Sequence, residues 1–498
     1  MAPSVIIERF STGYIVDEFG SSTSARYLAD YLDHLGASHV VVETKYVDRH
    51  FLDDFVEFYS RAFEPPPPHC SRFHFFAEPS DPEGFERLLD RAPSSEADRV
   101  HVQRELQSRY LGFVVRRPLP KRPMGRTVLR TYSGDPDRLY TVVRAYRAHL
   151  LGMELRVDGL AYQQQDGGAA VCASTALWSA FQRVAYMSGE RTPTPAAVTR
   201  AARSPFPASH GLADGDMARA IDALGYTAER LKPGDNAPLF RAQVASFLRS
   251  GHPVVLLLGA PASSGSGVGH AVTLTGYRES VPARVDVGAS QLWVRGAAAE
   301  VVYVHDDNLG SHAHFEFQAD PSTSDLNLLR GRSTGPQTNW WTPDVWRVDG
   351  ALVPKPNKVR MPIEQLYALK AMLSKWVQET LELAGEEAPP PIVMDGYFAS
   401  GIDVQRSVVG NPYRPDDARH WQRHHTLPRH VAVIEVSDMQ GLSLAAFVFD
   451  ATTLAHHQRG ALALLCPAID PGSTLGATMR MLGQHFEITP AFCAAAAP

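Results

Sequence analysis

The chain has 498 residues, 44% hydrophobic and 20% charged, which is typical of a globular protein. Its formal charge of -6 argues against a strongly basic surface for nucleic acid. The sequence has no run of about 18 apolar residues and no basic start ahead of an apolar stretch, so we expect neither a membrane span nor a signal peptide. The scattered cysteines lack the spacing of a disulfide framework and favour a reducing cytoplasm; they are Cys70, Cys172, Cys466 and Cys493.

Residues 1–150 are expected to form a mixed α/β region whose role the sequence leaves open. An apolar stripe over Ser22–Leu35 predicts a helix with its N-cap among residues 21–23. Strand-like runs are Val5–Arg9, His39–Glu43, Tyr110–Arg116 and Thr127–Tyr132. A local basic run indicates a solvated strand face more than a nucleic-acid site; it consists of Arg116, Arg117, Lys121, Arg122, Arg126 and Arg130.

Residues 151–350 read as an α+β domain, because a group of helices precedes a group of strands. The predicted helices are Cys172–Ser188, a helix opened by Thr194 and Pro195, Asp214–Leu224 and Pro238–Ser250. The predicted strands are Met153–Asp158, Val254–Leu258, Ala271–Tyr277, Gln291–Val294 and Val301–His305.

Residues 351–498 are expected to form a second mixed α/β region, separated by a proline-containing linker. It holds a long helix at Ile363–Leu383 and strands at Val431–Val436 and Leu444–Phe449. Four histidines in this region suggest a metal site, but neighbouring arginines repel cations and Pro428 interrupts the segment; they are His420, His424, His425 and His430. We therefore predict no metal and no cofactor.

Cys172 stands at the first turn of an apolar-faced helix. Unpaired N–H groups and the helix dipole at that position favour a thiolate, the form of cysteine that attacks a carbonyl carbon. Glycines just before it would let the backbone approach a substrate closely. Three glutamines also precede the helix, and any of them could donate a hydrogen bond to a developing oxyanion; they are Gln163, Gln164 and Gln165.

A base and an orienting group for such a thiol follow in chain order. His270 opens a predicted strand and is flanked by glycines, and two aspartates end the next strong strand. Period-2 alternation puts Val302, Val304 and Asp306 on one face, which favours Asp306 over Asp307 as the partner of the imidazole. Two nearby histidines are expected to be polar surface residues; they are His305 and His312.

This order of Gln, Cys, His and Asp resembles the papain-like cysteine peptidase superfamily. The segments QQQDGGAAVCASTAL and GHAVTLTGY are most similar to the bacterial double-glycine leader peptidases, which process bacteriocins. The resemblance covers residues 162–310 and implies a papain-like central domain between mixed α/β regions. It implies Cys172 as nucleophile, His270 as base, Asp306 as the orienting group and Gln165 as the oxyanion donor.

Two features depart from that pattern. The superfamily's glutamine stands six residues before the cysteine, where this chain has Asp166, so Gln165 serves only with a one-residue bulge. His270 and Asp306 are 36 residues apart, which requires an inserted excursion over Glu279–Ala299.

The expected function is therefore that of a cysteine peptidase or isopeptidase working through a thioester on a protein or peptide substrate. An acyl transferase or deamidase would use the same three residues, although the tryptophan that transglutaminases place next to their cysteine is here Ala173. A binding module on the same scaffold is the third alternative. The oligomeric state stays open.

Overall fold

The computed structural model describes residues 5–77, 84–91, 95–132, 135–166, 168, 171–204, 211–234, 236–259, 269–318, 328–332, 345–383, 391–410, 426–453 and 460–492. The chain divides into two compact units. The first comprises Met1–Arg230, Gly251–Tyr277 and Val301–Pro354, and the second comprises Leu231–Ser250, Arg278–Glu300 and Lys355–Pro498. The first unit thus takes in most of the first two predicted regions. The second takes in the third region together with two segments of the middle one.

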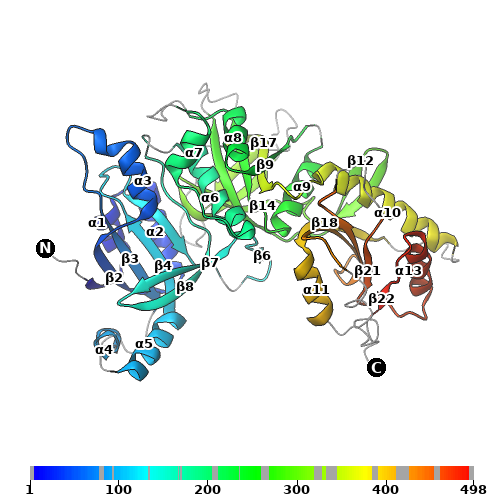
Figure 1. The fold of residues 1–498 in the computed structure, drawn as a ribbon, viewed down its shortest axis with the longest axis horizontal. Helices are drawn as coiled ribbons and strands as arrows, with labels where there is room; N and C mark the ends of the chain where they lie inside the picture. The colour runs from blue at the N-terminus through cyan, green and yellow to red at the C-terminus, as the bar shows by residue number, and fades with distance from the viewer. Residues whose placement is uncertain are drawn as a thin grey trace. The chain divides into compact units, whose positions relative to one another are not determined.

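The N-terminal part of the first unit is a five-stranded antiparallel sheet in the order β1-β2-β3-β4-β5 (Figure 1). Its strands are β1 (Val5–Arg9), β2 (Ala37–Tyr46), β3 (Cys70–Ala77), β4 (Tyr110–Arg116) and β5 (Met124–Leu129). Its helices are α1 (Thr12–Phe19), α2 (Thr23–His34), α3 (Arg49–Glu57), the 3-10 turn η1 (Tyr59–Arg61), α4 (Gly84–Arg91) and α5 (Glu96–Arg109). Helix α2 begins after Ser22, whose side-chain oxygen accepts a hydrogen bond from the backbone N–H of Ala25, which confirms the predicted N-cap.

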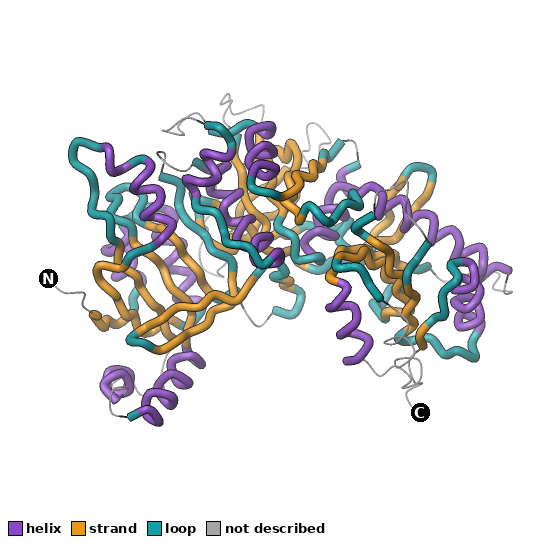
Figure 2. Tube along the Cα trace, in the orientation of Figure 1, coloured by secondary structure: helices purple, strands orange, loops and turns teal. Residues whose placement is uncertain are grey.

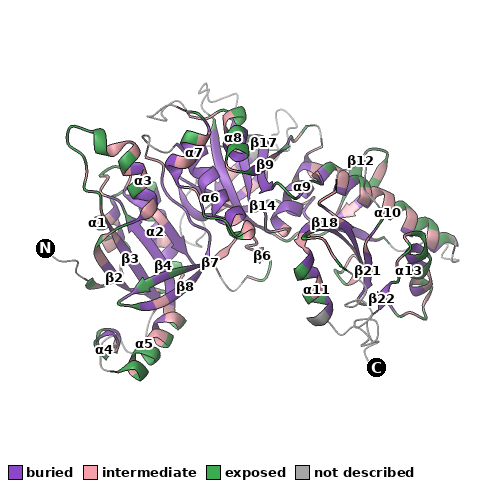
Figure 3. Ribbon diagram, viewed as in Figure 1, coloured by how far each residue is buried: buried purple, intermediate pink, exposed green. Residues whose placement is uncertain are grey.

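A hairpin leads from this sheet to three helices. The hairpin consists of β7 (Arg144–Leu150) and β8 (Met153–Gly159), and its two-residue turn has Leu151 and Gly152 at positive φ. The helices are α6 (Cys172–Ser188), α7 (Pro195–Ala201) and α8 (Asp214–Ala223). Helix α6 is almost wholly buried within the core of this unit, as Figure 3 shows.

The remaining strands of the first unit form an antiparallel sheet that closes on itself. The order is β10-β11-β14-β15-β16-β17, and β17 also pairs with β10. The bounds are β10 (Val254–Gly259), β11 (His270–Arg278), β14 (Val301–Asp306), β15 (Gly310–Gln318), β16 (Leu328–Arg332) and β17 (Val345–Pro356). Two shorter strands extend it, β6 (Arg138–Leu139) beside β11 and β9 (Tyr226–Leu231) at the end of the order.

The second unit is a seven-stranded sheet with helices, drawn by element type in Figure 2. Its strands are β12 (Ala283–Val287), β13 (Ser290–Val294), β18 (Val393–Ser400), β19 (His430–Ser437), β20 (Ser443–Asp450), β21 (Ala463–Cys466) and β22 (Ala491–Phe492). Its helices are α9 (Ala237–Arg249), α10 (Ile363–Leu383), α11 (Gly401–Gly410) and α13 (Thr474–His485). The excursion predicted over Glu279–Ala299 is the β12–β13 hairpin, and it belongs to this unit.

The chain is therefore α+β, as predicted, with antiparallel strands and helices in both units. The helices expected at Cys172–Ser188 and Ile363–Leu383 have those bounds. The strand expected at Thr127–Tyr132 begins and ends three residues earlier, because Met124 pairs with Arg116 in β4. Within the described residues, no helix is both long and apolar enough to cross a membrane.

The prediction that the basic run of residues 116–130 is a solvated face is wrong for two of its members. Arg117 is buried, and its guanidinium donates hydrogen bonds to the carbonyl oxygens of Arg122 and Gln164. Arg126 is half-buried and forms an ion pair with Asp48 at 2.8 Å. Their charges are thus engaged inside the fold and are not available to a nucleic acid.

Candidate active site

Cys172 is the first residue of α6 and is half-buried. Val171 stands before it in extended conformation as the N-cap. The backbone N–H of Val171 donates to Oγ of Ser174 at 2.9 Å, and this hydroxyl donates to the carbonyl oxygen of Val171 at 3.1 Å. Since Leu177 and Trp178 anchor the helix in the core, the thiol is held at a fixed helix N-terminus.

The segment before the cysteine is anchored by a buried ion pair. Oδ2 of Asp166 lies 3.7 Å from Nη1 of Arg117, and Oδ1 accepts a hydrogen bond from the backbone N–H of Gly168 at 2.9 Å. A Cβ at Gly168 would lie 2.5 Å from the ring of Phe58, so a larger residue would displace that ring. Asp166 therefore shapes the loop, and Gly167 lies outside the described residues.

His270 is the first residue of β11, paired with Leu258 of β10, and it is 8% exposed. Its Nε2 lies 3.1 Å from Oδ1 of Asp306. The thiol of Cys172 lines the same cleft and also contributes to the raised pKa of His270. With Nε2 directed at the carboxylate, Nδ1 is the ring nitrogen left for the sulfur. The first glycine of its predicted flanking pair, Gly267, lies outside the described residues.

Two carboxyl groups reach the imidazole from the end of β14. Oδ1 of Asp306 also accepts a hydrogen bond from the backbone N–H of Asn308 at 2.9 Å. Oδ1 of Asp307 lies farther from Nε2 of His270, at 3.7 Å. Both side chains are buried, and neither oxygen of Asp307 has a hydrogen-bond partner among the described residues. Strand parity thus selected the nearer carboxylate, although both aspartates face the ring.

The charges of this group depend on one another. Burial alone would lower the pKa of His270, but the adjacent Asp306 carboxylate raises that pKa well above its ordinary value. Burial likewise opposes ionisation of Asp306, yet His270 and backbone N–H donors hold the pKa of this carboxyl below its usual range. For Asp307, burial outweighs the attraction of His270 and, with the charge of Asp306, raises its pKa to about 7. The favoured arrangement is a charged His270 beside an ionised Asp306. Asp307 is neutral below pH about 7.

Gln165 is half-buried and lines the same cleft as Cys172 and His270. Its Nε2 donates to Oδ1 of Asn308 at 3.3 Å. The two glutamines before it are buried instead, and Oε1 of Gln164 accepts a hydrogen bond from the backbone N–H of Met124. Of the three candidates, only Gln165 is therefore available to a group bound in the cleft.

The cleft has a volume of about 790 Å³. Its walls come from the starts of α6 and α8, from β10 and β11, and from β17. Its apolar lining includes Leu212, Met217, Leu257 and Trp346. The ring of Trp346 lies 5.4 Å from that of His270, centroid to centroid.

Some site residues were missed in the sequence, and two were misread. Asn308, which contacts both Gln165 and Asp306, gave no signal beyond its position two residues after the aspartate. His305 and His312 are buried, which corrects their expected surface placement. Nε2 of His305 donates to the carbonyl oxygen of Leu160, and burial lowers its pKa to about 3. Both are neutral structural histidines.

The described residues contain one group of three potential metal ligands within 4.8 Å of one another, namely His270, Asp306 and Asp307. In this structure the same three side chains interact with one another, because His270 pairs with Asp306 and lies near Asp307. Of the four histidines considered earlier for a metal, His420, His424 and His425 lie outside the described residues. The expected absence of a metal stays a prediction.

Three of the residues predicted from the resemblance, Cys172, His270 and Gln165, line one cleft, and the fourth, Asp306, contacts the imidazole of His270. Cys172 comes from a helix start, His270 from a strand start, Asp306 from a strand end and Gln165 from the loop before the helix. Their roles rest on this geometry and its chemistry. Compared with models of known protein families and with curated proteins, the chain matches none.

Proposed function

We propose that this protein is a cysteine hydrolase that cleaves an amide or isopeptide bond of a protein or peptide substrate. The observation that carries the proposal is the imidazole of His270, which shares a cleft with the thiol of Cys172 and has its Nε2 3.1 Å from Oδ1 of Asp306. A thiol, an imidazole and an orienting carboxylate in this order form the arrangement that thiol hydrolases use.

In the proposed reaction the Cys172 thiolate attacks the substrate carbonyl carbon. The C–N bond breaks, and the imidazolium of His270 donates its proton to the leaving amine. The acyl group is then held as a thioester. Water attacks the thioester while His270 accepts a proton, and the acid product leaves with the thiolate restored. Asp306 keeps the imidazole oriented and stabilises its charged form.

Gln165 is the proposed side-chain donor to the oxyanion that develops during each attack. Its amide N–H groups lie on the cleft beside the thiol, where they can be redirected from Asn308 to a substrate oxygen. The backbone N–H of Cys172, in the first turn of α6, has no acceptor among the residues that the structure describes and is the proposed second donor.

The proposal extends to the fold of the central region, the cellular location and the source of the protein. We propose that residues 151–350 contain a papain-like domain, supported by helices α6–α8 ahead of a closed set of antiparallel strands. We also propose a cytoplasmic location, since four scattered cysteines suit a reducing compartment. A bacterial source follows from the resemblance alone. The flanking regions are not assigned a ligand.

The test is acylation of the thiol by an activated ester, p-nitrophenyl acetate. We expect a burst of p-nitrophenolate, and mass mapping of the quenched protein should find one acetyl group on Cys172. Slow release into water supports a hydrolase, whereas fast release only with an added primary amine favours the acyl transferase. Absence of acetylation at Cys172, with the protein folded, would leave only the binding module.

A further inference from the structure

Two hydroxyl groups of helix α2 hold the turn that carries Asp306. Oγ of Ser24 donates to the carbonyl oxygen of Asn308 at 2.8 Å, and the hydroxyl of Tyr27 donates to that of Ser311 at 3.0 Å. Both donors lie 284 residues away from their acceptors in the sequence. The N-terminal region is thus joined directly to the β14–β15 turn.

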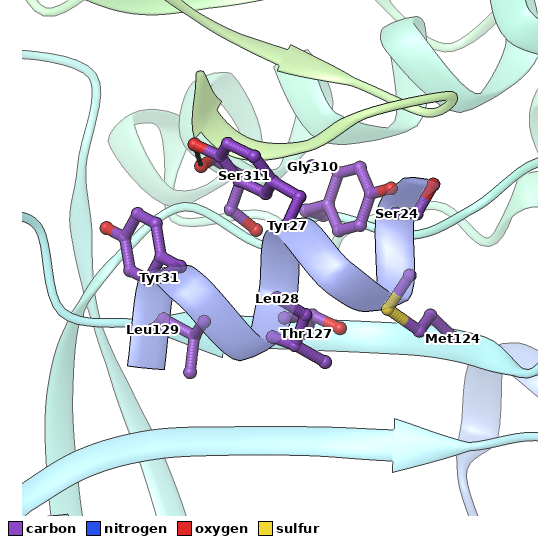
Figure 4. A pocket seen from close by; sticks show the side chains of 10 residues that line it. Ser24, Tyr27, Leu28, Tyr31, Met124, Thr127, Leu129, Gly310 and Ser311 are labelled. Carbon is purple, nitrogen blue, oxygen red and sulfur yellow. Dashed lines mark hydrogen bonds between the residues drawn. The ribbon is translucent and has the colours of Figure 1, made fainter. Parts of the chain in front are cut away.

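Packing around this contact is close. A Cβ at Gly310 would lie 2.1 Å from Cδ1 of Tyr27, so the turn fits against the tyrosine ring only with glycine there. Figure 4 shows Tyr27 of α2 beside Gly310 and Ser311. The cavity left between them measures about 10 Å³, which is about the space of a single water.

A third hydroxyl, from the chain segment just before the cysteine loop, also contacts the turn. The hydroxyl of Tyr162 donates to the carbonyl oxygen of Asp307 at 3.4 Å. Three carbonyl groups of the turn therefore receive hydroxyl donors from the N-terminal side of Cys172.

The backbone of the turn is hydrogen-bonded to Asp306 itself. Within it, the backbone N–H of Asn308 donates to Oδ1 of Asp306 at 2.9 Å, and that of Leu309 donates to the Asp306 carbonyl oxygen at 3.0 Å. Oδ1 is also the atom that faces Nε2 of His270. A shift of the turn backbone would therefore move the carboxylate relative to the imidazole.

We propose that helix α2 is a positioning element of the thiol site, in which Ser24 and Tyr27 hold the Asp306–Ser311 turn in register with His270. The inference rests on the proposed function and assigns a role to the N-terminal region. Ser24 and Tyr27 are positioning residues, since their hydroxyl groups bind carbonyl oxygens of the turn and act on the imidazole only through it.

The same helix supplies a matched control. Tyr31 lies one turn after Tyr27, is equally buried, and its hydroxyl donates to the carbonyl oxygen of Arg130 at 2.7 Å, away from the turn. Tyr27→Phe and Tyr31→Phe each remove one hydroxyl–carbonyl hydrogen bond from α2 and keep the ring. They are expected to cost similar stability, so a difference between them in reactivity reports on the turn.

The experiment measures the rate of Cys172 alkylation by chloroacetamide against pH in the full chain, with melting temperatures for each variant. In the wild type, we expect labelling of Cys172 to continue at a pH at which an ordinary thiol no longer reacts, because the imidazolium favours the thiolate. Tyr27→Phe should raise the pH midpoint of labelling and slow the reaction at pH about 6 by about three- to tenfold. Ser24→Ala should act in the same direction, and Tyr31→Phe should follow wild type.

Two results would overturn the inference. If wild-type Cys172 labels with the pH dependence of an ordinary thiol, the proposed function fails and the positioning role fails with it. If wild type has the shifted profile but Tyr27→Phe and Ser24→Ala match Tyr31→Phe, only the positioning role is refuted. Should Tyr27→Phe not fold, Ser24→Ala, which deletes a single oxygen, decides between the outcomes.

Discussion

Nε2 of His270 lies 3.1 Å from Oδ1 of Asp306, although 36 residues separate the two in the chain. The strands that carry them, β11 and β14, are antiparallel neighbours, with Thr273 opposite His305. The start of one strand therefore meets the end of the other. The residues between them form the β12–β13 hairpin of the second unit, so the long separation leaves the pairing intact.

Removal of the Asp306 side chain should lower the pKa of His270 and slow the reaction of Cys172. Asp306→Ala takes away the charge that keeps the pKa of His270 well above its ordinary value, so the thiolate loses its cation at mildly acidic pH. We expect alkylation of Cys172 at pH about 6 to slow by about tenfold to a hundredfold. Asp306→Asn, which keeps an acceptor for Nε2, should lie between wild type and the alanine variant. Equal rates in all three proteins would show that the contact is not used.

Asp307 should affect stability more than reactivity. Its folded pKa of about 7 is above the ordinary value of 3.8, so the folded state favours the neutral acid. The stability from this group is complete below pH about 4 and is lost as the pH rises through about 7, by up to roughly 4 kcal/mol. Asp307→Asn should therefore unfold at higher denaturant than wild type at pH about 8 and at a similar concentration at pH about 4. A variant that is less stable at pH about 8 would contradict this account.

Much of the site follows from local sequence signals. An apolar stripe with glycines before it located Cys172 at a helix start, and period-2 alternation chose the aspartate nearer to His270. Other features depend on contacts between distant segments. Nothing local indicates that Tyr27 reaches Ser311, that Arg117 is buried against Asp166, or that His305 and His312 are interior. These burials depend on contacts with helix α2 and with the chain segment around Leu160–Asp166, which periodicity does not encode.

Gln165 should matter for turnover but not for alkylation. An oxyanion donor stabilises the negative charge that forms on the carbonyl oxygen when the thiolate attacks an ester. Chloroacetamide is attacked at its CH2 carbon with loss of chloride, so no oxyanion forms. Gln165→Ala should lower the acylation rate with p-nitrophenyl acetate by about a hundredfold and leave the alkylation rate within about twofold. Equal losses in both reactions would instead indicate that Gln165 supports the fold of the cysteine loop.

The buried Lys370 of α10 allows a prediction about the stability of the second unit. Its side chain is fully buried, its Nζ lies 3.8 Å from the ring centroid of Tyr367, and it has no hydrogen-bond partner among the described residues. Burial lowers its pKa from 10.5 to about 7. Because unfolding takes up a proton between these values, stability falls as the pH is lowered from 10.5 to about 7, by at most roughly 5 kcal/mol.

Lys370→Met should therefore stabilise the second unit at neutral pH and flatten that pH dependence. Chemical denaturation monitored at pH about 7 and about 10 measures both effects. The Lys375→Met variant is a suitable control, since Lys375 is on the same helix and its side chain is 71% exposed. A loss of stability in Lys370→Met at neutral pH would show that the ammonium group has a favourable partner in the fold.

The most direct measurement of the central claim is site-resolved alkylation of the wild type and of His270→Ala at pH about 6. Because an imidazolium favours the adjacent thiolate, Cys172 should label far faster than Cys70, whose burial raises its pKa to about 12, and faster than Cys466, which is buried. Cys493 lies outside the described residues and serves as an internal comparison. His270→Ala should slow labelling of Cys172 by at least about tenfold. Because Asp306 loses its buried partner, the variant is measured below its own melting temperature. If Cys172 labels no faster than Cys493, or if His270→Ala leaves its rate unchanged, the thiol site is not catalytic.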